Sequence, residues 1–67
     1  MERLRTARLK AGLSQKQAAE RLRRSQSFVS RSESGERRVD LVEALEFAAV
    51  YGVALENILP VTKNDES

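Results

Sequence analysis

Apolar residues recur along this chain at the spacing of helices. Three of them in the first segment fall at i, i+3 and i+7: Leu4, Ala7 and Ala11. This stripe predicts a helix over residues 2–11 that turns these residues toward a core, with Arg8 at its border and Gly12 as its end. No stretch alternates apolar and polar residues as a half-buried strand would.

Two short segments follow, and each begins after a serine. The first covers residues 15–22 after Ser14, which forms the capping-box pattern with Gln17. The second covers residues 26–34 after Ser25 and stops at a glycine. The few residues between the segments leave room only for a sharp turn. Two brief helices joined in this way predict a helix-turn-helix, whose second helix can enter the major groove of DNA.

A fourth helix is predicted to start at Asp40, with Glu43 at the reciprocal capping-box position, and to end at Gly52. Its apolar residues on the face expected to meet the core are Leu41, Ala44, Leu45, Ala48 and Tyr51. Phe47 lies at the edge of this face. The remaining apolar residues lie off it, either as scattered surface residues or as a second interface: Val42, Ala49 and Val50.

A fifth short helix is predicted over residues 55–59. Its start is weak because Ala54 offers no capping side chain, and Pro60 closes it. The expected fold is therefore all-α, a compact bundle of five short helices in one domain over residues 1–60. The polar residues 61–67 are expected to form a disordered tail.

The amino-acid composition narrows the classes of protein to which this chain could belong. The chain has 67 residues with neither cysteine nor histidine, which excludes disulfides and the common zinc-ligand sets, so no metal or other cofactor is expected. No apolar run approaches the roughly 20 residues of a membrane span, and no signal peptide is recognisable. We therefore expect a cytoplasmic, nucleoid-associated protein with no membrane contact. An enzyme is disfavoured, because there is no glycine-rich phosphate loop and the carboxylates are spread along outward faces.

The charge is unevenly distributed along the chain. Residues 1–38 hold eleven of the twelve basic residues and four of the ten acidic ones, giving +7, and residues 39–67 carry −5, so that the net charge is +2. A basic half beside an acidic half favours a polyanion on one surface and a different partner on another. The alternative, that these charges only solvate helix faces, remains open.

A set of residues around the two short helices carries a family pattern: the run Leu13-Ser14-Gln15, Ala19, the run Ser25-Gln26-Ser27, and Glu33 shortly before Gly35. Their order and spacing resemble the lambda-repressor-like, Cro-type helix-turn-helix family, often called XRE-like and found in prokaryotes and phages. The resemblance covers residues 4–59. It implies a bundle of five short helices that binds double-stranded DNA, usually as a symmetric homodimer on a palindromic operator.

The resemblance also implies roles for individual residues. The residues that would contact bases are Gln26, Ser27, Ser30 and Arg31. Those that would contact phosphates are Gln15, Arg37 and Arg38. A structural salt bridge would join Arg8 to Glu33. The base-reading roles agree with the chemistry, because Gln can form two hydrogen bonds with adenine and Arg two with guanine.

Two residues depart from the family pattern. Arg23 stands in the turn where the family often has glycine, and a positive φ there would cost about 1 kcal/mol. Ser32 replaces a larger apolar residue, which leaves a smaller core. Phe28 is ambiguous between contact with a thymine methyl group and packing against a neighbouring helix, and we favour partial packing.

The leading hypothesis is a sequence-specific, DNA-binding transcriptional regulator of the repressor or controller type. Its recognition helix would be residues 26–34, and it would dimerise through the fourth and fifth helices. The alternative is an antitoxin-like or other protein-interaction module that uses the acidic second half to bind a second protein.

Overall fold

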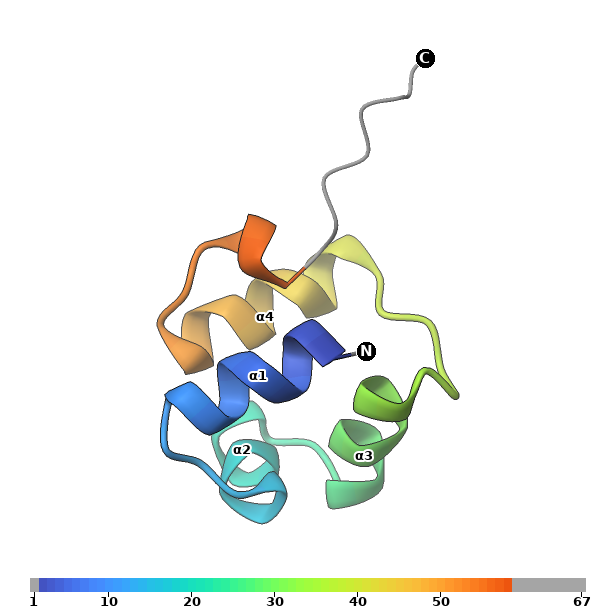
Figure 1. Ribbon diagram of the computed structural model, residues 1–67. Coiled ribbons are helices and arrows are strands. Elements are labelled where there is room, and N and C mark those ends of the chain that lie inside the picture. The colour runs from blue at the N-terminus through green and yellow to red at the C-terminus, as the bar shows by residue number, and fades with distance from the viewer. Residues whose placement is uncertain (1, 59–67) are drawn as a thin grey trace.

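Helices account for all the regular secondary structure in residues 2–58, the part of the chain that the computed structural model describes. The elements are α1 (Glu2–Lys10), α2 (Gln15–Leu22), α3 (Gln26–Ser34), α4 (Leu41–Tyr51) and the 3-10 helix η1 (Leu55–Asn57). The predicted all-α fold is confirmed, with α2 and α3 forming the predicted pair (Figure 1). The fifth element is shorter than predicted and is not an α-helix. Leu59, Pro60 and the polar tail over residues 61–67 lie outside the described residues.

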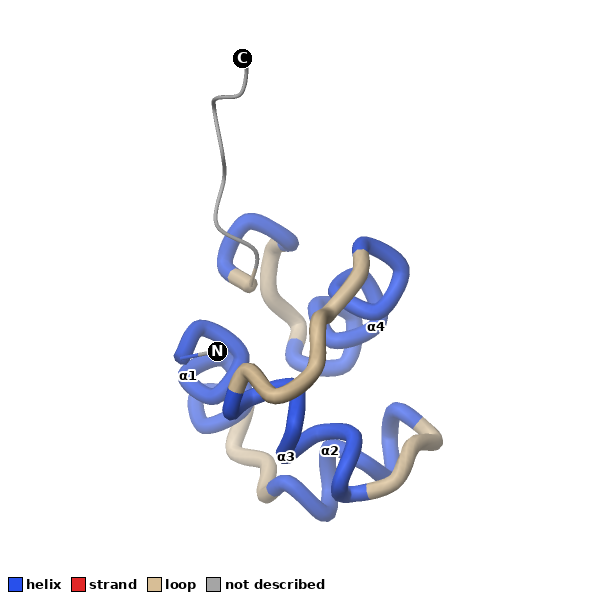
Figure 2. The backbone as a smooth tube through the Cα atoms, turned by 90° about the vertical axis from the view of Figure 1, so that its right-hand side faces the viewer, coloured by secondary structure: helices blue, strands red, loops and turns tan. Residues whose placement is uncertain are grey.

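The helices pack into one bundle, in which α1 contacts α3 and α4, and α2 contacts α3 and α4. In both views α4 and η1 lie on one side of α1, and α2 and α3 lie on the other (Figures 1 and 2). The α3 backbone packs closely against α2 and α1, whereas its attachment to α4 is made mainly by side chains.

The core is built from apolar side chains of α1 to α4, together with Leu13 before α2 and Ile58 after η1. Its buried members are Leu4, Ala7, Leu13, Ala18, Ala19, Leu22, Val29, Ala44, Phe47, Ala48, Tyr51 and Ile58. The alanines present no bulk between helices, so the backbones can approach closely. Ser32 is fully buried among these residues, which gives the reduced core that the sequence predicted.

Three predicted core positions are wrong. Leu41 and Leu45 of α4 are 57% and 51% exposed, because the neighbouring helices cover the side of α4 that carries Phe47. The sequence had placed Phe47 only at the edge of this face, but it is fully buried. Ala11 is also exposed, because α1 ends at Lys10 and the chain turns away before completing another turn.

The predicted helix caps are present. The Ser14 hydroxyl accepts a hydrogen bond from the Gln17 backbone N–H at 3.0 Å, and the Gln17 side chain accepts one from the Ser14 N–H at 2.9 Å. Asp40 and Glu43 form the same reciprocal pair at the start of α4. The Ser25 hydroxyl accepts from the Phe28 N–H at 3.1 Å. Each cap satisfies backbone donors that have no partner within the helix.

The turn between α2 and α3 contains a left-handed residue that is not glycine. Arg23 has φ 58° and ψ 42°, and its backbone N–H donates to the Glu20 carbonyl oxygen at 3.2 Å. The following N–H, of Arg24, donates to the Ala19 carbonyl oxygen at 3.0 Å. These bonds end α2 and turn the chain sharply into α3, at the cost of placing a side chain where glycine is favoured.

Side chains around one aromatic ring attach α3 to α4. The Phe28 ring stacks on Phe47 with centroids 5.7 Å apart and planes 9° from parallel. The guanidinium carbons of Arg24 and Arg37 lie 4.6 Å and 4.4 Å from the Phe28 centroid. Such cation–π contacts add to the attraction between stacked rings. Phe28 therefore packs partly inside the protein, as favoured from the sequence.

Each of these arginines also pairs with a carboxylate of α4. Arg37 forms a two-point ion pair with Glu43, with nitrogen–oxygen distances of 2.8 Å and 2.9 Å. Arg24 lies 3.3 Å from a Glu46 oxygen in a more exposed pair. Hydrogen bonding to Arg37 is the main reason that the pKa of Glu43 lies below its ordinary value and the pKa of Arg37 above its own. We call Arg24, Phe28, Arg37, Glu43, Glu46 and Phe47 the Phe28 cluster.

The left-handed turn generates a stability prediction. Replacing Arg23 by glycine should raise the free energy of unfolding by about 0.5–1 kcal/mol, because glycine adopts positive φ without steric cost. The matched control is Arg21→Gly, within the helical part of α2, which should lower it by about 1 kcal/mol. Urea denaturation of both variants measures the difference, and a loss of stability in R23G would contradict the assigned strain.

The Arg37–Glu43 pair generates a pH prediction. Because the folded-state pKa of Glu43 is lowered, its stabilising contribution is present above its ordinary pKa of 4.5 and is lost as the pH falls through the folded value. Glu43→Gln removes the charge and keeps an amide that can still form the capping box. The stability difference between wild type and E43Q should therefore be largest near neutral pH and shrink below pH 4.5.

Chemical denaturation at a series of pH values measures this difference. The control is Glu36→Gln, because Glu36 is exposed and its carboxylate has no ion pair within residues 2–58. A wild-type to E43Q difference that stays constant across the acidic range would show that the charge of Glu43 does not support the fold.

Candidate nucleic-acid interface

The outward face of α3 carries four polar side chains with no internal partners. Gln26, Ser27, Ser30 and Arg31 are all exposed, and they occupy two successive turns of α3. No hydrogen bond or ion pair within residues 2–58 restrains their side chains. The opposite side of the helix, with Val29 and Ser32, is buried. The structure thus brings the four predicted base-contacting residues together on one accessible surface.

An ion pair between α1 and α3 sets the orientation of this surface. The Arg8 guanidinium donates to both Glu33 oxygens, through Nε at 2.6 Å and Nη2 at 3.2 Å, and the two side chains are only 9% and 6% exposed. Arg8 also donates through Nη1 to the Leu13 carbonyl oxygen at 2.9 Å. One side chain therefore joins α1, the turn that follows it and the end of α3.

Two groups at this ion pair, Arg8 and the nearby Tyr51, have pKa values above their ordinary ones. Hydrogen bonding to Glu33 raises the pKa of Arg8 above its ordinary value, although burial of the guanidinium opposes that shift. Tyr51 of α4 lies close enough for the charges of Arg8 and Glu33 to influence its pKa. Burial, with a smaller contribution from Glu33, raises the pKa of Tyr51 to about 12, so this phenol stays neutral beside the ion pair. Loss of either ion-pair partner would leave a buried charge uncompensated, which is strongly destabilising.

Gln15 lies at the start of α2, next to the end of α3. Its side-chain amide donates to Glu33 at 3.1 Å, so it is linked to the Arg8–Glu33 pair. The side chain is partly exposed, and the first turn of α2 has backbone N–H groups without helical partners. An acceptor such as a phosphate oxygen can be bound at such a position. The structure therefore places this predicted phosphate contact beside the α3 surface.

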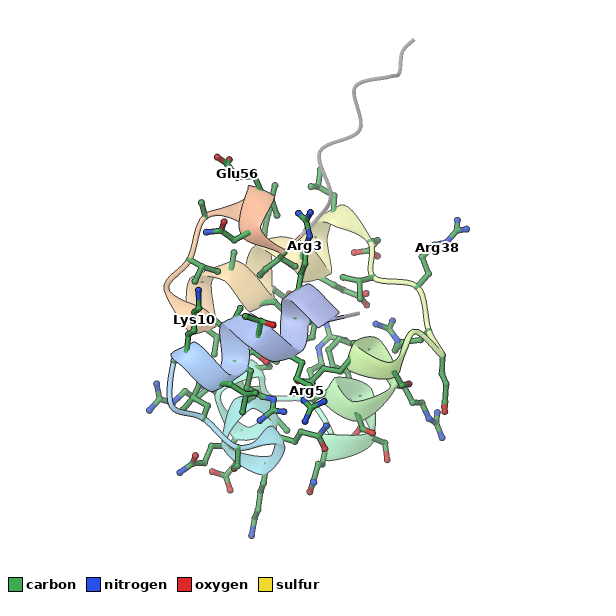
Figure 3. All side chains as sticks on the ribbon, viewed as in Figure 1. Arg3, Arg5, Lys10, Arg38 and Glu56 are labelled. Atoms are coloured by element: carbon green, nitrogen blue, oxygen red, sulfur yellow. The ribbon has the colours of Figure 1, made fainter. Side chains whose placement is uncertain are left out.

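The two arginines after α3 differ in their surroundings. Arg38 is exposed and extends away from the body of the protein (Figure 3). Arg37 turns inward, where it holds Glu43 and donates to the Ser32 hydroxyl at 3.3 Å. The sequence assigned both residues the same role and missed this inward contact. The one sequence feature that could have indicated a partner for Arg37 is Glu43, which was interpreted only as a capping residue.

Residues 2–58 were also searched for a membrane-spanning helix and for a metal site, and neither was found there. None of the helices in this range is both long and apolar enough to cross a bilayer. No group of three metal-ligating side chains in the same range is placed to hold an ion.

Comparison with known proteins identifies the family. Searches among curated proteins and among solved structures give no significant match. The model of one family, described as a helix-turn-helix domain, matches residues 2–58. This match is consistent with the lambda-repressor-like resemblance, and it covers all the elements from α1 to η1. The chain belongs to the helix-turn-helix domain family, which indicates that it binds DNA.

Proposed function

We propose that this protein is a sequence-specific regulator of transcription that inserts α3 into the major groove of its operator. The observation that carries the proposal is the exposed face of Gln26, Ser27, Ser30 and Arg31, whose side chains have no partners within residues 2–58. Gln26 can form two hydrogen bonds with adenine, and Arg31 can form two with guanine. The serines are short and reach bases or phosphates only at close range.

Gln15 and Arg38 are the proposed phosphate contacts on either side of α3. Phosphate contacts set the register of the protein on DNA without reading the sequence. Arg37 was expected to share this role, but Glu43 and the Phe28 ring already hold its guanidinium. We therefore assign Arg37 to holding α3 against α4, and Arg38 remains the proposed phosphate contact after α3.

We further propose that the regulator is a homodimer that pairs through α4. The exposed side of α4 carries a row of apolar side chains, Leu41, Val42, Leu45 and Ala49, which we call the α4 stripe. Val42 is 64% exposed, the most of the large apolar residues in residues 2–58. Rows of this kind often mark interfaces between chains. A two-fold dimer would place its recognition helices about 34 Å apart, one turn of DNA.

A second candidate uses the same stripe for a different partner. An antitoxin-like protein could cover it with a second protein while α3 binds DNA. The acidic residues of α4 favour this reading only weakly, because Glu43 and Glu46 are already paired with arginines inside the protein. The homodimer therefore remains the preferred proposal.

DNA titration tests the regulatory proposal. The wild-type protein should prefer an operator selected from random DNA over a random duplex of equal length. Arg31→Ala should weaken operator binding by about 1–3 kcal/mol and relax one base position. Arg38→Ala should weaken binding to all sequences alike and reduce the slope of log affinity against log salt by roughly 1. A wild-type protein without any preference for the selected operator would refute sequence-specific regulation.

Sedimentation tests the homodimer. Leu45→Glu places a charge in the α4 stripe and should give a folded monomer with roughly 100-fold weaker operator binding, because linkage between the half-sites is lost. The matched control is Leu9→Glu on α1, a leucine of similar exposure at 56%, which should leave the dimer intact. A wild-type monomer at high micromolar concentration, binding DNA only after a second protein is added, would instead support the second candidate.

A further inference from the structure

A shallow depression lies where α1 meets α2 and α3. Its lining residues are Arg5, Arg8, Gln15, Ser30, Glu33 and Ser34. Gln15 and Ser30 belong to the proposed DNA-binding surface, so the depression opens on the same side of the protein. Arg5 projects from α1 into this region (Figure 3). The sequence predicts no role for Arg5, because nothing along α1 indicates which exposed arginine lies beside α3.

The charges around the depression do not balance. Glu33 is the only carboxylate among its lining residues, and it already accepts hydrogen bonds from Arg8 and Gln15. Arg5 is exposed and has no ion pair within residues 2–58. The depression therefore has an excess of one positive charge, and that charge is on the side chain with the most freedom to reach a ligand.

The size of α3 indicates what would approach Arg5. A helix with its side chains is about 10–12 Å wide, close to the roughly 12 Å width of the major groove. When α3 fills the groove, groups beside it face the sugar–phosphate strands that form the groove walls. Arg5 lies beside α3 on the Gln15 side, whereas Arg38 lies beyond the end of α3. The two arginines therefore face different parts of the backbone.

We propose that Arg5 binds a phosphate of the DNA backbone in this depression, next to the phosphate contacted by Gln15. A phosphodiester carries one negative charge, which matches the excess positive charge, and a guanidinium fork fits its oxygens with two hydrogen bonds. The hydroxyl of Ser30 lines the same depression and can donate a further hydrogen bond, whereas the Ser34 hydroxyl already donates to the Arg31 carbonyl oxygen. This inference rests on the proposed DNA binding and adds a contact from α1 to it.

The test measures the salt dependence of DNA binding for full-length wild type, Arg5→Ala, Arg5→Lys and Lys10→Ala. Lys10 is the matched control, because it is an exposed cation on the same helix but at the far end from Arg5 (Figure 3). Each protein is titrated with the selected operator and with a random duplex over a range of salt concentrations. The thermal unfolding of each variant is measured in addition to these titrations. R5A should have the same unfolding midpoint as wild type, because Arg5 makes no ion pair within residues 2–58.

R5A should bind both duplexes several-fold more weakly at low salt, with a salt slope smaller by roughly 0.9, the value for one lost phosphate contact. R5K should retain most of the slope, and K10A should match wild type. An unchanged slope in R5A, or an equal loss in K10A, would overturn the Arg5 contact while leaving DNA binding itself intact. Absence of DNA binding by the wild type would overturn the proposed function, and the Arg5 contact with it.

Discussion

The Arg8–Glu33 ion pair is the constraint on which the DNA-facing surface depends. Arg8 binds the turn after α1 through the Leu13 carbonyl oxygen, and it binds α3 through Glu33. Gln15 at the start of α2 joins the same carboxylate. A single buried charge pair therefore determines how three helices meet. Its removal would disturb the proposed base-reading residues and phosphate contacts together, because all of them are positioned relative to α3.

The need for such a constraint comes from α3 itself. This helix is short and rich in serine, and only Val29 and Ser32 are buried along it. A helix of this kind gains little stability alone and must be held by tertiary contacts. Glu33 holds its last turn, and the Phe28 cluster attaches its first turn to α4. Because both attachments use the inner side of α3, the outer side stays free to bind a partner.

In the folded protein, charges that lie in opposite halves of the sequence are brought together in ion pairs. Arginines 8, 24 and 37 of the basic half are engaged in ion pairs within residues 2–58. Two of their partners, Glu43 and Glu46, belong to the acidic half. Within residues 2–58, these ion pairs partly neutralise the two halves against each other. The positive charge left for the proposed DNA contact belongs to Arg5, Arg31 and Arg38, which form no ion pair within residues 2–58.

Features that depend only on residues close together in the chain could be predicted from the sequence. Caps at Ser14, Ser25 and Asp40 form between residues three apart, so their pattern predicts the helix starts and with them the helix-turn-helix. Three other features became visible only in the fold: which side of α4 is covered, the inward turn of Arg37, and the position of Arg5 beside α3. These outcomes depend on how helices approach one another, which is settled by contacts between residues distant in the chain. The spacing of residues along the chain does not indicate such contacts.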